Sequence, residues 1–470
     1  MTAERAPRDE ALSAGPAPGA GPEPDSGQRT PDRRVIDLTE PRDGLPPVIA
    51  DSSELAAAVA RLAGGTGPLA VDAERASGYR YGQKAYLVQL RREGAGTVLI
   101  DPVACPDLSG LDSALAGVEA VLHAATQDLP CLAEIGYRPR VLFDTELAGR
   151  LLGYPRVALG TMVEELLGYR LAKEHSASDW SLRPLTEEML RYAALDVEIL
   201  TDLRDTLADQ LEEQGKTEWA RQEFAAIVAA PPHAPRADPW RRTSGIHKVR
   251  SRRGLAVVRA LWETRDEIAR EADLSPRRVL GDQAIIEAAK TMPASRPQLD
   301  AIGGFLARNA RRHGAAWMAA VRGARAADES ELPEVTGPAS SGPPPASRWA
   351  DRDPAAAERL AAARATVTAI AESVRLPAEN LLAPDTVRRL SWEPPHPLTP
   401  EVITDTLASL GARPWQAELT AGPLAAALAD PASVDTTAAP ANPAHPATAY
   451  ANAAAKAPDD GGSPAPGGHT

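Results

Sequence analysis

The stretch Leu69-Ala70-Val71-Asp72-Ala73-Glu74 sets two carboxylates at the end of an apolar run that is typical of a buried β-strand. Alternate side chains of a strand point to the same face, so we expect Asp72 and Glu74 to lie on one side of a sheet. A charge in such a strand is costly unless it has a partner or a metal ion. The stretch therefore predicts both a sheet and a cation site on it.

A second motif, Tyr192-Ala193-Ala194-Leu195-Asp196, lies in a helical pattern, where positions four apart share a face. Between the motifs, Asp128 offers a fourth carboxylate. Hard divalent cations prefer carboxylate oxygens, and two such ions can support phosphodiester hydrolysis. We expect Asp72, Glu74, Asp128 and Asp196 to be metal ligands. Tyr192 is expected to orient the attacking water rather than deprotonate it, because an unperturbed phenol has a pKa of about 10.

Three other residues or motifs near these have structural interpretations. Asp144-Thr145-Glu146 repeats the Asp-x-Glu pattern, but a helix-like segment follows it, so Asp144 is expected to be a helix N-cap. Trp180 is expected to be a packing anchor. Arg183 could reach a substrate phosphate or form a solvated salt bridge, and the sequence leaves both possibilities open.

Length and composition predict several folded units with linkers. A chain of 470 residues is too long for one ordinary core, and 44 Pro and 35 Gly indicate linkers and tails. No apolar run reaches the roughly 18 residues of a membrane span, and the polar, Pro-rich start argues against a secretory signal. Two cysteines are too few for a disulfide framework. These observations favour a cytoplasmic protein.

Charge is unevenly distributed along the chain. The net charge of −13 would argue against a nucleic-acid partner. Between residues 239 and 329, however, Lys and Arg outnumber Asp and Glu by 18 to 10, so the rest of the chain is more acidic still. Such asymmetry is typical of a basic module that binds polyanions, with affinity that falls as salt rises.

The pattern of apolar residues predicts a mixed sheet flanked by helices. Strand-like runs lie at 69–72, 86–90 and 97–100, with a hairpin turn at 92–96, and further runs at 120–123 and 141–143 alternate with helical patterns. Residues 185–214 look helical throughout. Pro-rich linkers at 231–235 and 337–345 separate a basic helical unit, 246–326, from a second helical unit, 351–428.

The motifs Asp72/Glu74, Asp128 and Tyr192/Asp196 resemble the three exonuclease motifs of the DEDDy 3′→5′ exonucleases. Segments 123–129, 143–145 and 178–185 look like ribonuclease D, and 252–256 with 278–280 look like a helicase-and-ribonuclease-D C-terminal (HRDC) domain. The resemblance implies an α/β ribonuclease-H-like exonuclease domain over 46–230, an HRDC domain over 246–326 and a second, HRDC-like all-α domain over 351–428. Residues 1–45 and 429–470 are expected to be disordered.

The resemblance also implies an activity: hydrolysis from the 3′ end of RNA with release of 5′-mononucleotides, dependent on two divalent ions, Mg²⁺ or Mn²⁺. It makes the five motif residues the site, with RNA, tRNA precursors in particular, as the partner, and with no membrane and no obligate protein partner. The HRDC domain would hold the RNA. Its removal, beyond about residue 235, is expected to weaken binding and leave the chemistry intact.

Two alternative functions remain open at this point. A DNA 3′→5′ exonuclease would use the same site, and only contacts to the 2′-OH would distinguish the two substrates. A catalytically idle RNA-binding protein would have lost a carboxylate, but all four are present.

Overall fold

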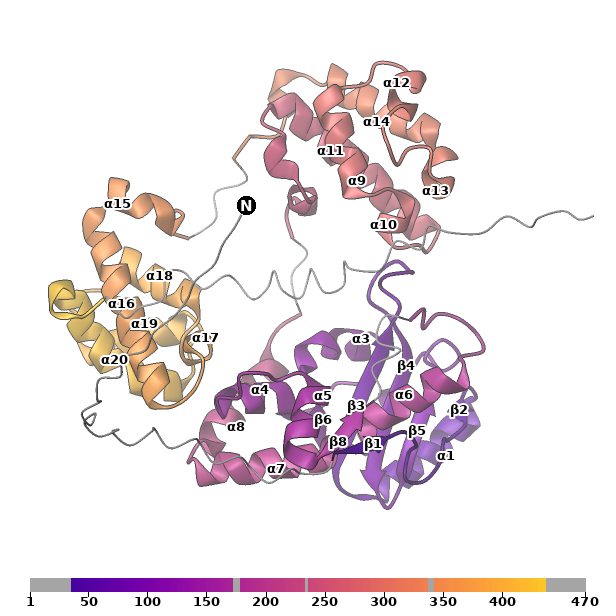
Figure 1. Cartoon of the computed structure of the whole chain (residues 1–470), viewed down its shortest axis with the longest axis vertical. Coiled ribbons are helices and arrows are strands. Elements are labelled where there is room, and N and C mark those ends of the chain that lie inside the picture. The colour runs from indigo at the N-terminus through magenta and orange to yellow at the C-terminus, as the bar shows by residue number, and fades with distance from the viewer. Residues whose placement is uncertain (1–34, 172–177, 233–235, 337–341, 437–470) are drawn as a thin grey trace, which may run out of the picture.

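The computed structural model describes residues 35–171, 178–232, 236–336 and 342–436, which form one α/β unit and two all-helical units (Figure 1). This confirms the predicted fold class. The disorder predicted for 1–34 and 437–470 lies outside the described residues. In the part of the chain that is described, no helix is both long enough and apolar enough to cross a membrane.

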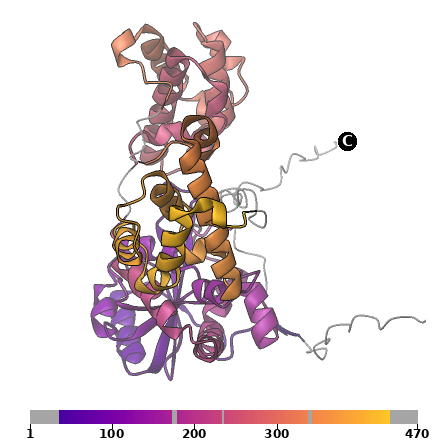
Figure 2. The same ribbon diagram turned by 90° about the vertical axis from the view of Figure 1, so that its left-hand side faces the viewer.

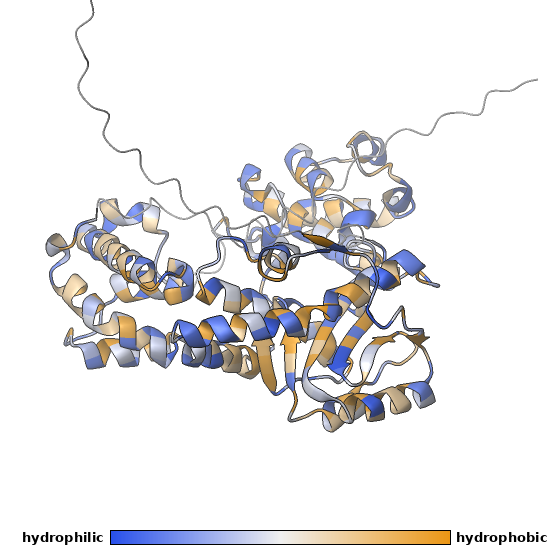
Figure 3. Cartoon of the chain, turned by 60° about the horizontal axis from the view of Figure 1, so that its bottom comes forward, coloured by the Kyte–Doolittle hydropathy of each residue, from blue (hydrophilic) through white to orange (hydrophobic). Residues whose placement is uncertain are grey.

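A six-stranded mixed sheet in the order β2-β5-β4-β3-β6-β7 forms the centre of the α/β unit. The strand β3 pairs antiparallel with β4 and parallel with β6, which places it inside the sheet. Its residues Leu69, Ala70 and Val71 are at most 1% exposed, and the sheet strands are mostly apolar in Figure 3. The hairpin turn between β4 and β5 is confirmed, with Gly94 and Gly96 at φ 78° and 71°. Strands β2 to β7 span Val48–Ile49, Thr66–Arg75, Ala85–Glu93, Gly96–Ile100, Glu119–Leu122 and Val141–Asp144.

Helices pack on this sheet, and side-chain caps fix where several of them begin. The carboxylate of Asp51 accepts hydrogen bonds from the first amides of α1, and Asp144 does the same for α4, which confirms Asp144 as an N-cap. Residues 185–214 were expected to be helical, and they form two helices, α6 and α7, with a break at Ile199. Helices α1 to α8 span Ser52–Ala63, Ser109–Ala114, Leu129–Glu134, Thr145–Leu151, Leu159–Met162, Glu187–Glu198, Leu200–Glu213 and Thr217–Ala229. Single 3-10 or π turns lie at Ala125–Gln127, Val163–Leu167, Pro239–Arg242, Ile246–Lys248, Glu329–Glu331, Ala346–Arg348 and Pro431–Ser433.

Order begins before residue 45, which corrects the expected end of the N-terminal disorder. The strand β1, Ile36–Leu38, pairs in parallel with β8, Tyr169–Leu171, to form a separate two-stranded sheet. Arg42 then contacts the carboxylates of Glu198 and Asp202. These partners lie more than a hundred residues away, so a polar, Pro-rich stretch is ordered by contacts that its own composition does not reveal.

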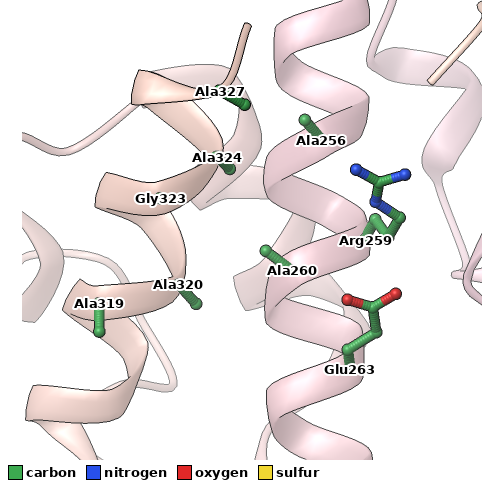
Figure 4. A pocket seen from close by; sticks show the side chains of 9 residues that line it. All are labelled: Ala256, Arg259, Ala260, Glu263, Ala319, Ala320, Gly323, Ala324 and Ala327. Carbon is green, nitrogen blue, oxygen red and sulfur yellow. The ribbon is translucent and has the colours of Figure 1, made fainter. Parts of the chain in front are cut away.

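The basic unit has its own hydrophobic core, centred on α9 and α14. Small side chains on both helices allow close approach and leave a shallow pocket between them (Figure 4). The pocket is lined by Ala256, Arg259, Ala260, Glu263, Ala319, Ala320, Gly323, Ala324 and Ala327. Helices α9 to α14 span Arg252–Glu271, Pro276–Val279, Asp282–Thr291, Arg296–Asp300, Arg308–Arg311 and Gly314–Ala326.

The C-terminal helical unit repeats the start of this layout, since a 20-residue helix, a 4-residue helix and a third helix follow one another in both units. Helices α15 to α20 span Trp349–Arg352, Pro354–Ser373, Ala378–Leu381, Pro384–Trp392, Pro400–Ser409 and Pro414–Ala429.

The C-terminal unit packs directly against the α/β unit (Figure 2). Trp415 stacks on Trp219 with ring centroids 4.7 Å apart, and its indole N–H donates to the Glu223 carboxylate at 3.0 Å. The buried Lys216 ammonium donates to the carbonyls of Leu151 and of Arg375 in the C-terminal unit. The two units therefore share one continuous core.

Candidate active site

The two acidic motifs meet where α6 packs on β3. Asp72 and Glu74 are two residues apart on β3 and share a face, whereas Tyr192 and Asp196 are one turn apart on α6. One carboxylate oxygen from each of Asp72, Glu74 and Asp196 lies within 4.8 Å of the other two. The fold thus brings three of the four expected carboxylates into one cluster.

Asp128 approaches the cluster from the turn before α3. Two backbone amides of that turn donate to the buried carboxylate of Asp144, which holds the turn in place. Asp128 is 5% exposed and forms an ion pair of 3.3 Å with Arg75, the residue that follows Glu74 on β3. Asp128 therefore lies beside the cluster and is partly neutralised by an arginine.

Burial perturbs the pKa of all four carboxylates, and repulsion between charges adds to it for three of them. Burial, followed by the charges of Asp72, Asp196 and Asp128, raises the pKa of Glu74 well above its usual range. Burial and the charge of Asp72 likewise raise the pKa of Asp128 and of Asp196, and burial raises the pKa of Asp72 itself. Asp72 thus contributes to the repulsion felt by each of the other three.

Tyr192 is held in a single place by contacts on two sides. Its hydroxyl donates a hydrogen bond to the Asp196 carboxylate, and its ring packs on Trp180 with centroids 6.3 Å apart. Burial and the nearby negative charges of Asp196, Glu74 and Asp72 raise the pKa of Tyr192. The hydroxyl therefore keeps its proton near neutral pH, which suits an orienting group better than a base.

The segment 178–185 forms the wall behind Tyr192. Trp180 is fully buried, as expected for a packing anchor. Arg183 resolves the alternative left open by the sequence, because its guanidinium binds the Asp101 carboxylate through two hydrogen bonds of 2.7 and 2.8 Å. The same guanidinium donates to the carbonyl of Trp180 at 2.9 Å, so Arg183 fixes this wall instead of offering a free cation.

An all-oxygen donor set with repelling carboxylates fits a divalent cation, which would relieve the repulsion that raises the pKa values. Sequence reasoning missed two contributors, Arg75 and Asp144. Arg75 carried a weak signal, its position directly after Glu74. Asp144 was assigned only as a cap, and its hydrogen bonds to the turn before Asp128 become visible only in three dimensions.

Family models match all three units. The 3′–5′ exonuclease model matches residues 46–212, and the HRDC model matches residues 254–321. For the second helical unit, where the sequence resemblance implied another HRDC-like domain, the matching model is the 3′ to 5′ exonuclease C-terminal domain, over residues 342–428.

Similar proteins agree with these matches. Ribonuclease D of Granulibacter bethesdensis is 33% identical over 287 residues, which cover 58% of this chain and 71% of that protein. Ribonuclease D of Escherichia coli is 32% identical over 276 residues, which cover 57% and 72%.

Solved structures match over more of the chain. A crystal structure of a protein from Bifidobacterium adolescentis aligns with a TM-score of 0.78 at 38% identity, covering 84% of this chain and 100% of that one. The structure of Escherichia coli RNase D aligns with a TM-score of 0.59 at 27% identity, covering 77% and 98%.

The fold, the acidic cluster on β3 and α6, and these relatives lead to one assignment. The chain belongs to the ribonuclease D family and is a hydrolytic 3′–5′ exoribonuclease.

Proposed function

We propose that Asp72, Glu74, Asp128 and Asp196 hold two divalent ions, Mg²⁺ or Mn²⁺, at which the terminal phosphodiester of an RNA 3′ end is hydrolysed. The observation that carries this proposal is the approach of three carboxylate oxygens to within 4.8 Å of one another on two elements of the core. When bound, such ions lower the pKa of a water molecule and stabilise the departing oxygen.

Side chains of the protein orient the attacking water and the Asp128 carboxylate. The Tyr192 hydroxyl, fixed by Asp196 and by the ring of Trp180, holds the attacking water in line with the scissile bond. Arg75 keeps Asp128 in place through their ion pair and offsets part of the negative charge. Attack of water on the terminal phosphate and departure of the adjoining 3′ oxygen release a 5′-mononucleotide.

The substrate that we propose is a structured RNA precursor with a 3′ extension, and tRNA precursors are the first candidates. Support comes from Escherichia coli RNase D, a structural neighbour described as an exoribonuclease involved in structured RNA processing. The excess of Lys and Arg between residues 239 and 329 also supports it, because contacts to phosphates bind RNA without regard to base sequence.

The test compares a duplex RNA with a 3′ single-stranded extension and a DNA of the same sequence, each with EDTA, Mg²⁺ or Mn²⁺. We expect RNA to be shortened one nucleotide at a time from its 3′ end only when metal is present, with 5′-mononucleotides as the product. Cleavage in EDTA would contradict the metal-dependent mechanism. Faster hydrolysis of the DNA would contradict the substrate class and favour a DNA exonuclease.

A further inference from the structure

The loop that follows the acidic strand β3 lies between the active-site wall and the HRDC domain. This loop, residues 76–84 and here called the coupling loop, joins β3 to β4 and reaches toward α10 (Figure 1). Two of its tyrosines pack on different cores: Tyr79, like Tyr192, packs on the cluster that contains Trp180, whereas Tyr81 packs on the HRDC core. The loop is therefore shared between the two domains.

On the HRDC side, the coupling loop is held by contacts to α9, to α10 and to the turn between them. The Tyr81 hydroxyl donates to both carboxylate oxygens of Asp266 at 3.1 Å, and its amide donates to Asp273 at 3.3 Å. The Arg278 guanidinium lies 4.1 Å from the centre of the Tyr79 ring. Backbone contacts add to these, since the Ser275 amide donates to the Tyr79 carbonyl at 2.9 Å.

Arg80, between the two tyrosines, reaches both domains at once. Its Nε donates to the Ser181 hydroxyl at 2.7 Å, and its Nη1 lies 3.5 Å from the Asp273 carboxylate of the HRDC domain. The amide and hydroxyl of Ser181 also donate hydrogen bonds to the Asp179 carboxylate, so Arg80 holds in place the turn that contains Trp180. A continuous set of contacts thus runs from Asp273 through Arg80 and the Trp180 turn to the ring of Tyr192.

We propose that docking of the HRDC domain helps to position the active-site residues through the coupling loop. Arg80 is the positioning residue, because it fixes the Trp180 wall behind Tyr192. The loop also begins directly after Arg75, which binds Asp128, so it is connected to the acidic site there as well as through Trp180 and Tyr192. This differs from the division of labour expected from the sequence, in which the basic module only holds RNA. The inference rests on the proposed role of Tyr192 in orienting water.

The test uses the full-length chain with four single substitutions. Arg80→Met removes the contacts to Ser181 and to Asp273. Arg80→Lys keeps the positive charge but loses the planar guanidinium group, and Asp273→Asn removes only the negative charge on the HRDC side. Arg352→Met, at an exposed arginine on α15 outside the basic module, is the control for general loss of positive charge. Two quantities are measured: the single-turnover rate at saturating RNA, and RNA affinity in metal-free buffer.

For Arg80→Met we expect the single-turnover rate to fall by about tenfold, since a small misplacement of an orienting group is costly, with RNA affinity unchanged. Asp273→Asn should give a smaller loss in the same direction. Arg80→Lys should lie between wild type and Arg80→Met. The double variant Arg80→Met/Asp273→Asn should be no slower than Arg80→Met alone, because the two residues act through one contact. Arg352→Met should keep the wild-type rate.

Hydrogen exchange measured on segment 178–185 gives a readout that does not depend on activity. The amides of Trp180 and Leu182 bond within their own turn, at 3.1 and 3.2 Å, and both should exchange faster in Arg80→Met and in Asp273→Asn. An unchanged rate with weaker RNA binding, or unchanged exchange in this segment, would overturn the coupling. A wild-type protein that does not cleave RNA would instead overturn the proposed function, and the exchange experiment would still decide the coupling.

Discussion

Replacing Asp72 with Asn tests the acidic cluster in two ways that have opposite signs. The substitution keeps the shape of the side chain and removes one negative charge from a site where three carboxylate oxygens lie within 4.8 Å of one another. Activity should be lost because a metal ligand is weakened. Stability without metal should rise, because the repulsion that Asp72 exerts on the other carboxylates disappears.

The size of each effect follows from the geometry. Two unit charges 4.8 Å apart repel by about 3.5 kcal/mol at an effective dielectric constant of 20. The same repulsion raises the pKa of Glu74 and of Asp196, so protonation can relieve part of it, and we expect Asp72→Asn to gain about 1–2 kcal/mol in unfolding free energy in EDTA. Loss of the metal-assisted charge stabilisation, about 4 kcal/mol, corresponds to a rate about a thousandfold lower.

The assay follows thermal unfolding in EDTA and in Mn²⁺, together with single-turnover hydrolysis of the RNA that carries a 3′ extension. Wild type should gain stability in Mn²⁺, whereas Asp72→Asn should begin higher and gain little. Asp209→Asn, an exposed carboxylate on α7, is the control and should behave as wild type. An Asp72→Asn protein that is less stable in EDTA and still gains the wild-type increment in Mn²⁺ would refute the argument.

Three further substitutions test other parts of the structure. Tyr192→Phe should keep Mn²⁺-induced stabilisation and lower the single-turnover rate by about a hundredfold, because only the group that orients the water is lost; an unchanged rate would contradict that role. Gly153→Ala should lower the unfolding free energy by about 2–4 kcal/mol, since a Cβ at φ +85° would lie 2.3 Å from the Arg375 carbonyl oxygen; Gly110→Ala, which meets open space, should not. His123 has its pKa lowered by burial from 6.5 to about 4, so the unfolded chain binds its proton first as pH falls. Wild type should therefore lose at most about 3 kcal/mol relative to His123→Gln between pH 6.5 and 4, measured by chemical denaturation, and parallel pH profiles would refute this.

Local patterns in the sequence predicted correctly which acidic residues share a face. Alternation along a strand put Asp72 and Glu74 on one face, and the four-residue spacing put Tyr192 and Asp196 on one face of α6. The Asp144 cap could also be predicted from the sequence, because its side chain bonds to the amides two and three residues further along the chain. Family resemblance then linked the three motifs, in this order along the chain, into one predicted site, which composition and spacing alone do not do.

The sequence by itself therefore determined most of the strands and helices, the acidic motifs and the uneven charge, since each depends on residues close together in the chain. Only the tertiary structure decided how distant segments meet: β1 beside β8, Arg75 on Asp128, and the coupling loop between Trp180 and the HRDC domain. Such contacts join segments whose own residue patterns do not indicate which distant segment they will contact. Packing of the whole chain selects them, because each satisfies a charge, a hydrogen bond or a buried surface that the segment alone leaves open.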